Sequence, residues 1–193
     1  MGNVKWMRRL AAAMLVVAVL VGAVWEYRQL RGSDSPVDNT GTGLTLFYGD
    51  KGIPLPPIEG RTLDGAQLNL DSLRGHVLVL NVWGSWCAPC RAEAPDLAKL
   101  SKETAPRGVR FVGIDVRDNV AAAKAFERNY GITYPSFDDQ QGLVLAQFTG
   151  IIPVGAVPST IVVDKTGTIR ARIIGRLDPS TLRGLITDAE ADR

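Results

Sequence analysis

Apolar and polar positions alternate along most of the chain between strand-like and helix-like patterns. Residues 77–83 and 109–114 are almost continuously apolar, which is typical of strands covered on both faces of a sheet. Residues 91–102 carry apolar side chains at roughly helical spacing, and the alanine-rich residues 120–130 end before a glycine, so a helix is expected after each strand. A shorter helix is expected at residues 142–148.

Turn signals indicate the remaining elements. Asp64-Gly65 lies between two short alternating runs and predicts a β-hairpin over residues 58–70. A second antiparallel hairpin is expected over residues 160–174. Asp178 is followed by proline, which predicts a final helix with Asp178 as its N-cap. Strands and helices in this order predict an α/β fold with a mixed sheet.

The first 31 residues have a different pattern. Three basic residues, Lys5, Arg8 and Arg9, precede an uncharged run at residues 10–25. One interpretation is an N-terminal transmembrane helix that anchors the protein with the rest of the chain on the extracytoplasmic side. A helix of that length reaches only about 24 Å at ~1.5 Å per residue, so flanking aromatic residues must complete the span. The alternative is a signal peptide with a small residue, Ala23, at the cleavage position.

Composition sets further limits. Residues 32–52 are rich in Gly, Ser and Asp and predict a flexible tether, which leaves residues 53–193 as one domain of ordinary size. The net charge is only +2, from 22 basic and 20 acidic residues, so a nucleic-acid partner is not expected. No bound metal is expected either, because the chain has two cysteines and one histidine, His76, too few soft ligands for a four-ligand zinc site.

Both cysteines, Cys87 and Cys90, lie in one Cys-X-X-Cys motif directly after the strand at residues 77–83. A disulfide that closes so small a loop restricts the unfolded chain little, so reversible redox chemistry is the better explanation for the pair. A helix beginning near Cys87 would lower the pKa of its thiol from ~8.5 toward ~3.5 to 7.5. Cys87 is therefore expected to be the nucleophile, and Cys90 the thiol that resolves the mixed disulfide.

The sequence around the pair resembles the thioredoxin-like superfamily, and within it the membrane-anchored TlpA/ResA/DsbE type of thiol-disulfide oxidoreductase. The resemblance covers roughly residue 53 to the C-terminus. It rests on three features: the segment Leu80-Asn81-Val82-Trp83-Gly84-Ser85-Trp86-Cys87-Ala88-Pro89-Cys90, then Pro95 in the next helix, and Val157-Pro158-Ser159-Thr160 before a strand. It implies a three-layer fold around a mixed central sheet.

The resemblance also implies roles for single residues. Pro158 is expected to be cis and packed against the cysteine pair, which leaves the backbone of Val157 free to pair with an extended substrate. Trp86 is expected at the rim of the site, where it contacts substrate. Glu93 matches a residue that assists proton transfer at the second cysteine in ResA-like proteins. Two interpretations of Glu93 stay open: a partly buried carboxyl with raised pKa, or a solvated side chain beside Arg91.

The segment at residues 149–156 also has two open interpretations: it shapes the surface that receives a partner protein, or it packs in the core.

The functional expectation is an extracytoplasmic, membrane-held enzyme that exchanges the Cys87–Cys90 disulfide with exported cysteine-containing proteins. Relatives of this type reduce the haem-binding cysteines of apocytochrome c and are recharged by a CcdA-type membrane electron donor. No bound cofactor is expected, because the disulfide itself carries the electrons. A dithiol oxidase remains the alternative, since spacing does not fix the direction of exchange. A copper carrier is a weaker alternative, because that class uses Cys-X-X-X-Cys and a distant histidine.

Overall fold

The computed structural model describes residue 22, residues 43–47 and residues 52–191. The segment interpreted as a membrane anchor or signal peptide, residues 1–31, lies outside this part of the chain except for Gly22. Among the described residues, no helix combines the length and the apolar character needed to cross a membrane.

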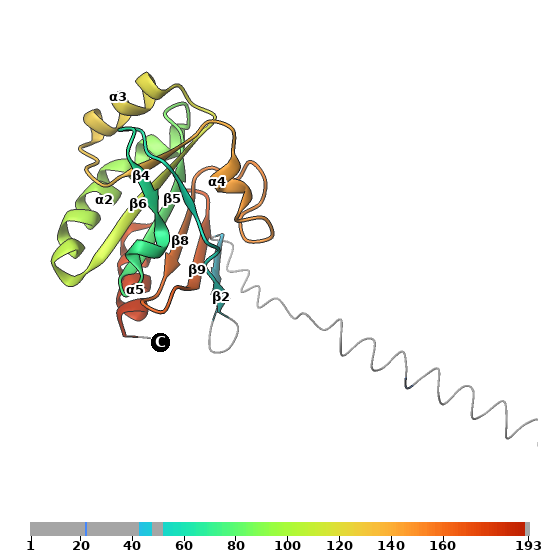
Figure 1. The fold of residues 1–193 in the computed structure, drawn as a ribbon. Coiled ribbons are helices and arrows are strands. Elements are labelled where there is room, and N and C mark those ends of the chain that lie inside the picture. The colour runs from blue at the N-terminus through green and yellow to red at the C-terminus, as the bar shows by residue number, and fades with distance from the viewer. Residues whose placement is uncertain (1–21, 23–42, 48–51, 192–193) are drawn as a thin grey trace, which may run out of the picture. The chain divides into compact units, whose positions relative to one another are not determined.

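A mixed sheet forms the centre of the described part of the chain, and seven strands belong to it there (Figure 1). The strands are β1 (Leu44–Leu46), β2 (Ile53–Pro54), β5 (Val77–Trp83), β6 (Val109–Val116), β7 (Ser136–Asp139), β8 (Ser159–Val163) and β9 (Thr168–Ile174). Their spatial order is β1-β9-β8-β5-β6-β7, with β2 also paired to β9. β5, β6 and β7 run parallel to one another, whereas β8 is antiparallel to β5 and to β9. The predicted mixed sheet is confirmed.

Helices cover both faces of the sheet and give three layers. On one face lie α2 (Ala88–Thr104), α3 (Val120–Tyr130) and α5 (Pro179–Glu190), which share apolar clusters with the sheet (Figure 1). The other face is covered by α4 (Leu143–Ala146), by the 3-10 helix η2 (Leu70–Leu73) and by residues next to the hairpin of β3 (Glu59–Arg61) and β4 (Gln67–Asn69). A second 3-10 turn, η3 (Ala105–Arg107), follows α2.

The apolar sequence of β5 follows from its position in the middle layer of the fold. Successive side chains of a strand point to opposite faces, and both faces of β5 are covered. Leu78, Leu80 and Val82 pack into the cluster beneath α4, while Val77 and Val79 pack beneath α2 and α5. All seven side chains are buried, so no position on β5 can be polar without a buried partner.

Two elements differ from the sequence prediction. The tether predicted at residues 32–52 is wrong at its C-terminal end, because β1 pairs antiparallel with β9 and Phe47 is buried in the core. The short apolar stretch that starts at Leu44 becomes a strand because it pairs with β9, which lies far away in sequence. β7 was not predicted either, since three of its four residues are polar and it is held by parallel pairing with β6.

The topology gathers several loops at one edge of the sheet. Parallel strands β5, β6 and β7 all end there, and β8 begins there because Ser159 pairs with Val82 near the end of β5. Ligand sites of open α/β sheets lie outside the carboxyl ends of the strands. The segments after β5, β6 and β7, together with the segment before β8, are therefore the place to look for chemistry.

Candidate active site

The cysteine pair lies where β5 gives way to α2. β5 ends at Trp83, α2 begins at Ala88, and Cys87 is the N-cap residue with extended backbone angles. Cys87 and Cys90 form a disulfide, and the Cys87 Sγ accepts a hydrogen bond from the Cys90 N–H at 3.2 Å. Pro89 is tolerated in the first turn because those N–H groups have no partner within the helix. The prediction that a helix begins next to Cys87 is confirmed.

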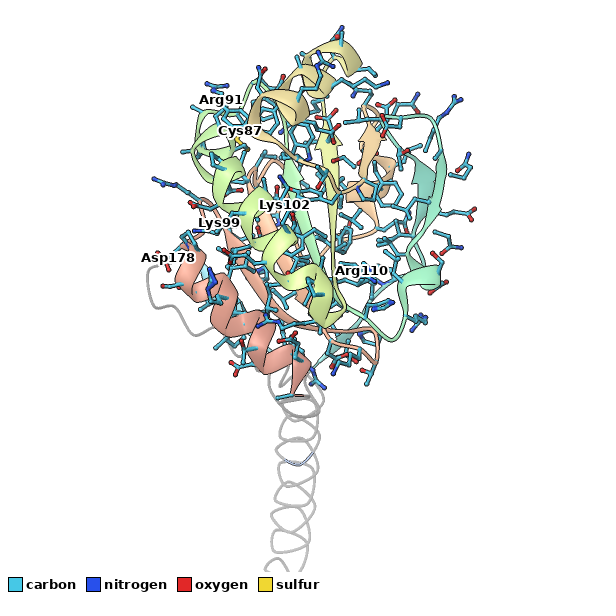
Figure 2. All side chains as sticks on the ribbon, turned by 90° about the vertical axis from the view of Figure 1, so that its left-hand side faces the viewer. Cys87, Arg91, Lys99, Lys102, Arg110 and Asp178 are labelled. Carbon is cyan, nitrogen blue, oxygen red and sulfur yellow. A yellow bond between two sulfur atoms is a disulfide. The ribbon has the colours of Figure 1, made fainter. Side chains whose placement is uncertain are left out.

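Burial does not distinguish the two cysteines in the disulfide form, because Cys87 is 3% exposed and Cys90 is 1% exposed. Both belong to an apolar cluster with Trp83 and Phe126, whose rings stack with centroids 4.5 Å apart. Position does distinguish them: Cys87 caps the helix, whereas Cys90 lies within its first turn. Figure 2 shows Cys87 and Arg91 near one end of α2, with Lys99 and Lys102 further along it.

Ser85 fixes the loop between β5 and α2. The Ser85 N–H donates to Oδ2 of Asp118, and the Ser85 hydroxyl donates to Oδ1 of the same residue at 2.8 Å. On the other side, the Arg91 guanidinium donates to the Ser85 carbonyl at 2.7 Å. Sequence reasoning missed Asp118; the available signal was a polar residue just beyond the end of the buried strand β6.

Trp86 lies at the rim, as predicted, and Trp83 lies in the core. Trp86 is 48% exposed, and its Nε1–H donates to the Val116 carbonyl at 3.2 Å. The guanidinium carbon of Arg117 lies 5.1 Å from the centre of the Trp86 ring, a cation–π geometry. Arg117 has a φ of 51°, in the left-handed region. The ring is thus held at its edge and on its face while much of it stays open to solvent.

Val116 and Arg117, which both contact Trp86, also line a groove of about 300 Å³. This groove therefore lies next to Trp86. Four residues of the segment at residues 149–156 also line it, namely Thr149, Ile152, Val154 and Gly155, and Val154 is fully exposed. Ile151 and Ile152 of the same segment are buried in the core cluster. The packing interpretation is therefore confirmed for Ile151 and Ile152, whereas residues 149–150 and 153–155 are exposed and their contact with a partner stays a prediction.

The Val157-Pro158 peptide bond is cis, as the resemblance implied. Val157 packs against the cluster that contains both cysteines, and Pro158 is buried immediately before β8. The structure therefore brings Trp86, Val157 and Pro158 together with the cysteine pair at one edge of the sheet.

Glu93 is buried, with 1% of its surface exposed, so its interpretation as a solvated residue beside Arg91 is wrong. Its Oε1 accepts from Asn81 Nδ2 and its Oε2 accepts from the Leu177 N–H, both at 3.0 Å. Burial raises the pKa of Glu93 to about 7, although these two hydrogen bonds and the charge of Arg176 oppose the increase. On α2, Glu93 is three residues after Cys90, which places both on the same face of the helix.

His76 lies at the opposite end of β5 from the cysteine pair. Its Nδ1 is 2.9 Å from the Gly108 carbonyl. The seven residues of β5 separate His76 from the segment that carries Cys87, a distance of roughly 23 Å at ~3.3 Å per residue. The copper-carrier interpretation needs a histidine beside the cysteines, so it is wrong for His76. Among the residues in the described ranges, no group of three or more His, Cys, Asp or Glu side chains has a geometry that could hold a metal ion.

A family model described as AhpC/TSA matches residues 52–172, from β2 into β9. The chain belongs to the AhpC/TSA family. Within the matched range lie the cysteine pair, Glu93 and Pro158. The thioredoxin-like fold that the sequence predicted is confirmed for this AhpC/TSA protein.

Comparison with individual proteins shows which kind of enzyme within this family the chain is similar to. The thiol-disulfide oxidoreductase ResA of Bacillus thuringiensis (strain Al Hakam) is 30% identical over 152 residues, which cover 75% of this chain and 86% of the relative. The structure of a DsbF homologue from Corynebacterium diphtheriae has 32% identity and a TM-score of 0.72, covering 78% and 96% of the two chains. A secreted thiol-disulfide isomerase from Corynebacterium glutamicum has 30% identity and a TM-score of 0.74, covering 81% and 96%. This AhpC/TSA protein is a thiol-disulfide oxidoreductase close to the ResA/DsbE type.

Proposed function

We propose that the protein works outside the cytoplasm as a reductant of disulfides in exported proteins, with Cys87 as nucleophile and Cys90 as resolving thiol. The observation that supports thiol-disulfide exchange through Cys87 is its position as N-cap of a 17-residue helix, where its sulfur already accepts the Cys90 N–H. Once reduced, a thiolate at this position is stabilised by that N–H and by the helix dipole. Cys90 has no such position.

The exchange occurs in two steps. The Cys87 thiolate attacks one sulfur of the substrate disulfide, forms a mixed disulfide and releases the other substrate sulfur as a thiolate, which takes a proton from water. Cys90 then loses its proton and attacks the Cys87 sulfur, which releases the second substrate sulfur as a thiolate that also takes a proton from water. The substrate gains two electrons and two protons, and the enzyme is left with the Cys87–Cys90 disulfide.

Glu93 accepts the Cys90 proton in the second step. Three features support this role: the carboxyl is buried, its pKa is about 7, and it shares a helix face with Cys90. A general base is most effective when its pKa lies near the working pH. An ordinary solvated glutamate, with a pKa near 4.3, would be a much weaker base at neutral pH.

The substrate lies against Trp86 and the Val157-Pro158 segment. The Val157 backbone pairs with an extended stretch of the partner beside its cysteine, as in strand addition. Apolar residues that flank this cysteine enter the groove between Arg117 and Val154, because that groove is continuous with Trp86 through Arg117.

Location and partners follow from the N-terminal sequence and the ResA/DsbE likeness. Residues 1–31 hold the enzyme at the membrane with residues 53–193 outside the cytoplasm, and a CcdA-type membrane protein returns electrons to the disulfide. Apocytochrome c is the proposed substrate, and neither flavin nor nicotinamide is needed. One of the compared relatives is named as a secreted protein, in agreement with this location.

A trapping experiment in the native host tests the proposal. The Cys90→Ser variant lacks the resolving thiol, so substrates should remain linked to Cys87 and be identified by mass spectrometry. Apocytochromes among the trapped proteins are the expected result. A broad set of secreted proteins without apocytochromes would instead support the dithiol oxidase. Protease digestion of the domain in spheroplasts checks its location, since an enclosed domain would be protected.

A further inference from the structure

Asp118 is the acceptor that holds the loop carrying Cys87. Its Oδ2 accepts the Ser85 N–H, and its Oδ1 accepts the Ser85 hydroxyl at 2.8 Å. Oδ1 also accepts the Asn119 N–H at 2.7 Å. All three bonds are donated to Asp118. Both carboxyl oxygens of Asp118 therefore act as acceptors in this loop.

A second carboxyl group, Asp115, lies behind Asp118 in strand β6. It is completely buried, with 0% of its surface exposed. Its Oδ2 accepts from Gln140 Nε2 at 3.2 Å, whereas its buried Oδ1 has no hydrogen-bond donor. The side chain lies within hydrogen-bonding reach of Asp118.

The charged groups that act on Asp115 are both acidic. Asp118 lies beyond the end of β6, and Asp138 is the neighbour of Asp115 across the ladder with β7. On the β5 side the neighbour is Trp83, which carries no charge. A buried carboxylate that faces two other acidic groups is strongly unfavourable, whereas a proton on it removes the charge and supplies a donor.

We propose that Asp115 keeps a proton on Oδ1 at neutral pH and donates it in a hydrogen bond to Asp118, so that the two residues together position Ser85 and the Cys87 loop. Asp115 is a positioning residue, since it acts on the loop only through Asp118. The proton gives Oδ1 of Asp115, which has no donor, the role of a hydrogen-bond donor, and Asp118 is its acceptor.

Asp115 titrates in a pH range in which thiols also titrate. Burial, together with the negative charges of Asp118 and Asp138, raises the pKa of Asp115 to about 8, although the hydrogen bond from Gln140 opposes the increase. Above that pH two adjacent carboxylates repel each other, and the contact between Asp118 and Ser85 weakens. The effect of this weakening on catalysis rests on the proposed function of Cys87. The hydrogen bond between Asp115 and Asp118 does not depend on that function.

The titration is measured on the oxidised full chain in detergent, where neither cysteine titrates. We expect the ¹H–¹⁵N resonance of Ser85 to shift between pH 6 and pH 9.5 with a midpoint near pH 8. In Asp115→Asn the resonance should stay constant, because the new amide keeps a permanent donor for Asp118 and an oxygen for Gln140. In Asp138→Asn the midpoint should fall, since one like charge is removed and Ser85 is not contacted.

A constant Ser85 resonance in the wild type, or an unchanged titration in Asp115→Asn, would overturn the pair. The reduced protein tests the functional half: alkylation of Cys87 should show a second inflection near pH 8 that Asp115→Asn lacks. Identical profiles would overturn the positioning role. If Cys87 proved unreactive while Ser85 titrated as expected, the proposed function would fail and the aspartate pair would stand.

Discussion

Asn81 of β5 donates a hydrogen bond of 3.0 Å to Glu93 of α2, so the strand before the cysteine pair and the helix after it share a buried polar contact. Asn81 also donates to Thr160 of β8, and the second oxygen of Glu93 accepts from Leu177 before α5. One carboxyl group thus connects the elements that surround the cysteines. The Glu93 carboxyl group is buried away from solvent, and Glu93 lies about one helical turn after Cys90 on α2.

Replacing Glu93 by glutamine should slow the resolving step. Glutamine cannot accept the Cys90 proton, and we expect release of a trapped substrate to fall by on the order of tenfold to a hundredfold at pH 7. The wild-type rate should also rise through an inflection near pH 7 that Glu93→Gln lacks. Stopped-flow release of a labelled peptide from the Cys87 mixed disulfide measures both.

The matched control for this prediction is Glu103→Gln. Glu103 lies on the same helix but is exposed and pairs with Arg183 and Lys99 at the surface. The same chemical change there should leave release within twofold of the wild type. Equal release by wild type and Glu93→Gln from pH 5 to pH 9 would remove Glu93 from the mechanism.

Stability should fall as the pH rises from about 4 to about 8. The unfolded chain releases the protons of Glu93 and Asp115 near their ordinary pKa values, whereas the folded protein keeps them up to about 7 and about 8. The folded state binds more protons within this window, so raising the pH favours unfolding, by up to ~1.4 kcal/mol per pH unit for each group.

Urea denaturation of the oxidised protein at a series of pH values measures this slope. The double variant Glu93→Gln/Asp115→Asn has no buried acid at either position and should show a much flatter profile between pH 4 and pH 8. A wild-type stability that increases over this range relative to the double variant would contradict the pKa directions assigned to both residues.

A charge introduced into the groove next to Trp86 should weaken substrate binding without changing the reactivity of the Cys87 thiol. Val154→Glu places a carboxylate where an apolar side chain of the partner is proposed to lie, so KM for a protein substrate should rise by on the order of tenfold, equivalent to losing the ~1.5 kcal/mol of a buried valine. Alkylation of Cys87 by iodoacetamide should be unchanged. Leu143→Glu is the control, because Leu143 is also exposed but does not line this groove.

Two glycines make a matched pair for the packing around Trp83. A Cβ added at Gly113 would come within 2.3 Å of Ser136 Oγ and 2.5 Å of Trp83 Nε1, whereas one at Gly184 in α5 would meet nothing within 4 Å. Gly113→Ala should therefore destabilise the protein by about 1–3 kcal/mol. Gly184→Ala should stabilise it by about 0.5–1 kcal/mol through helix propensity. Thermal unfolding of both variants measures the difference.

Sequence reasoning succeeded where periodicity and local chemistry determine the structure. β5 and α3 match their predicted ranges, residues 77–83 and 120–130, because continuous apolar character and alanine content followed by glycine are local signals. The start of a helix near Cys87 followed from the end of a strand directly before Cys-X-X-Cys. The resemblance supplied the cis bond before Pro158, which no local pattern determines.

Elements that depend on distant partners were not predictable in the same way. β1 and β7 become strands only by pairing with β9 and β6, and their own sequences are short or polar. Asp118 contacts Ser85 across 33 positions of the chain, so no spacing rule indicates it. The burial of Glu93 was open for the same reason, since it depends on Leu177 and Asn81 rather than on the neighbours of Glu93 in sequence.

The most direct test of the account is the relative reactivity of the two thiols in the reduced full chain. Brief alkylation at pH 7 followed by peptide mass spectrometry gives the rate at each cysteine. The helix N-terminus at Cys87 predicts that this thiol reacts at least tenfold faster than Cys90, and that Cys87→Ser abolishes disulfide exchange with any substrate. Equal rates at both positions, or faster alkylation of Cys90, would contradict the assignment of Cys87 as the nucleophile.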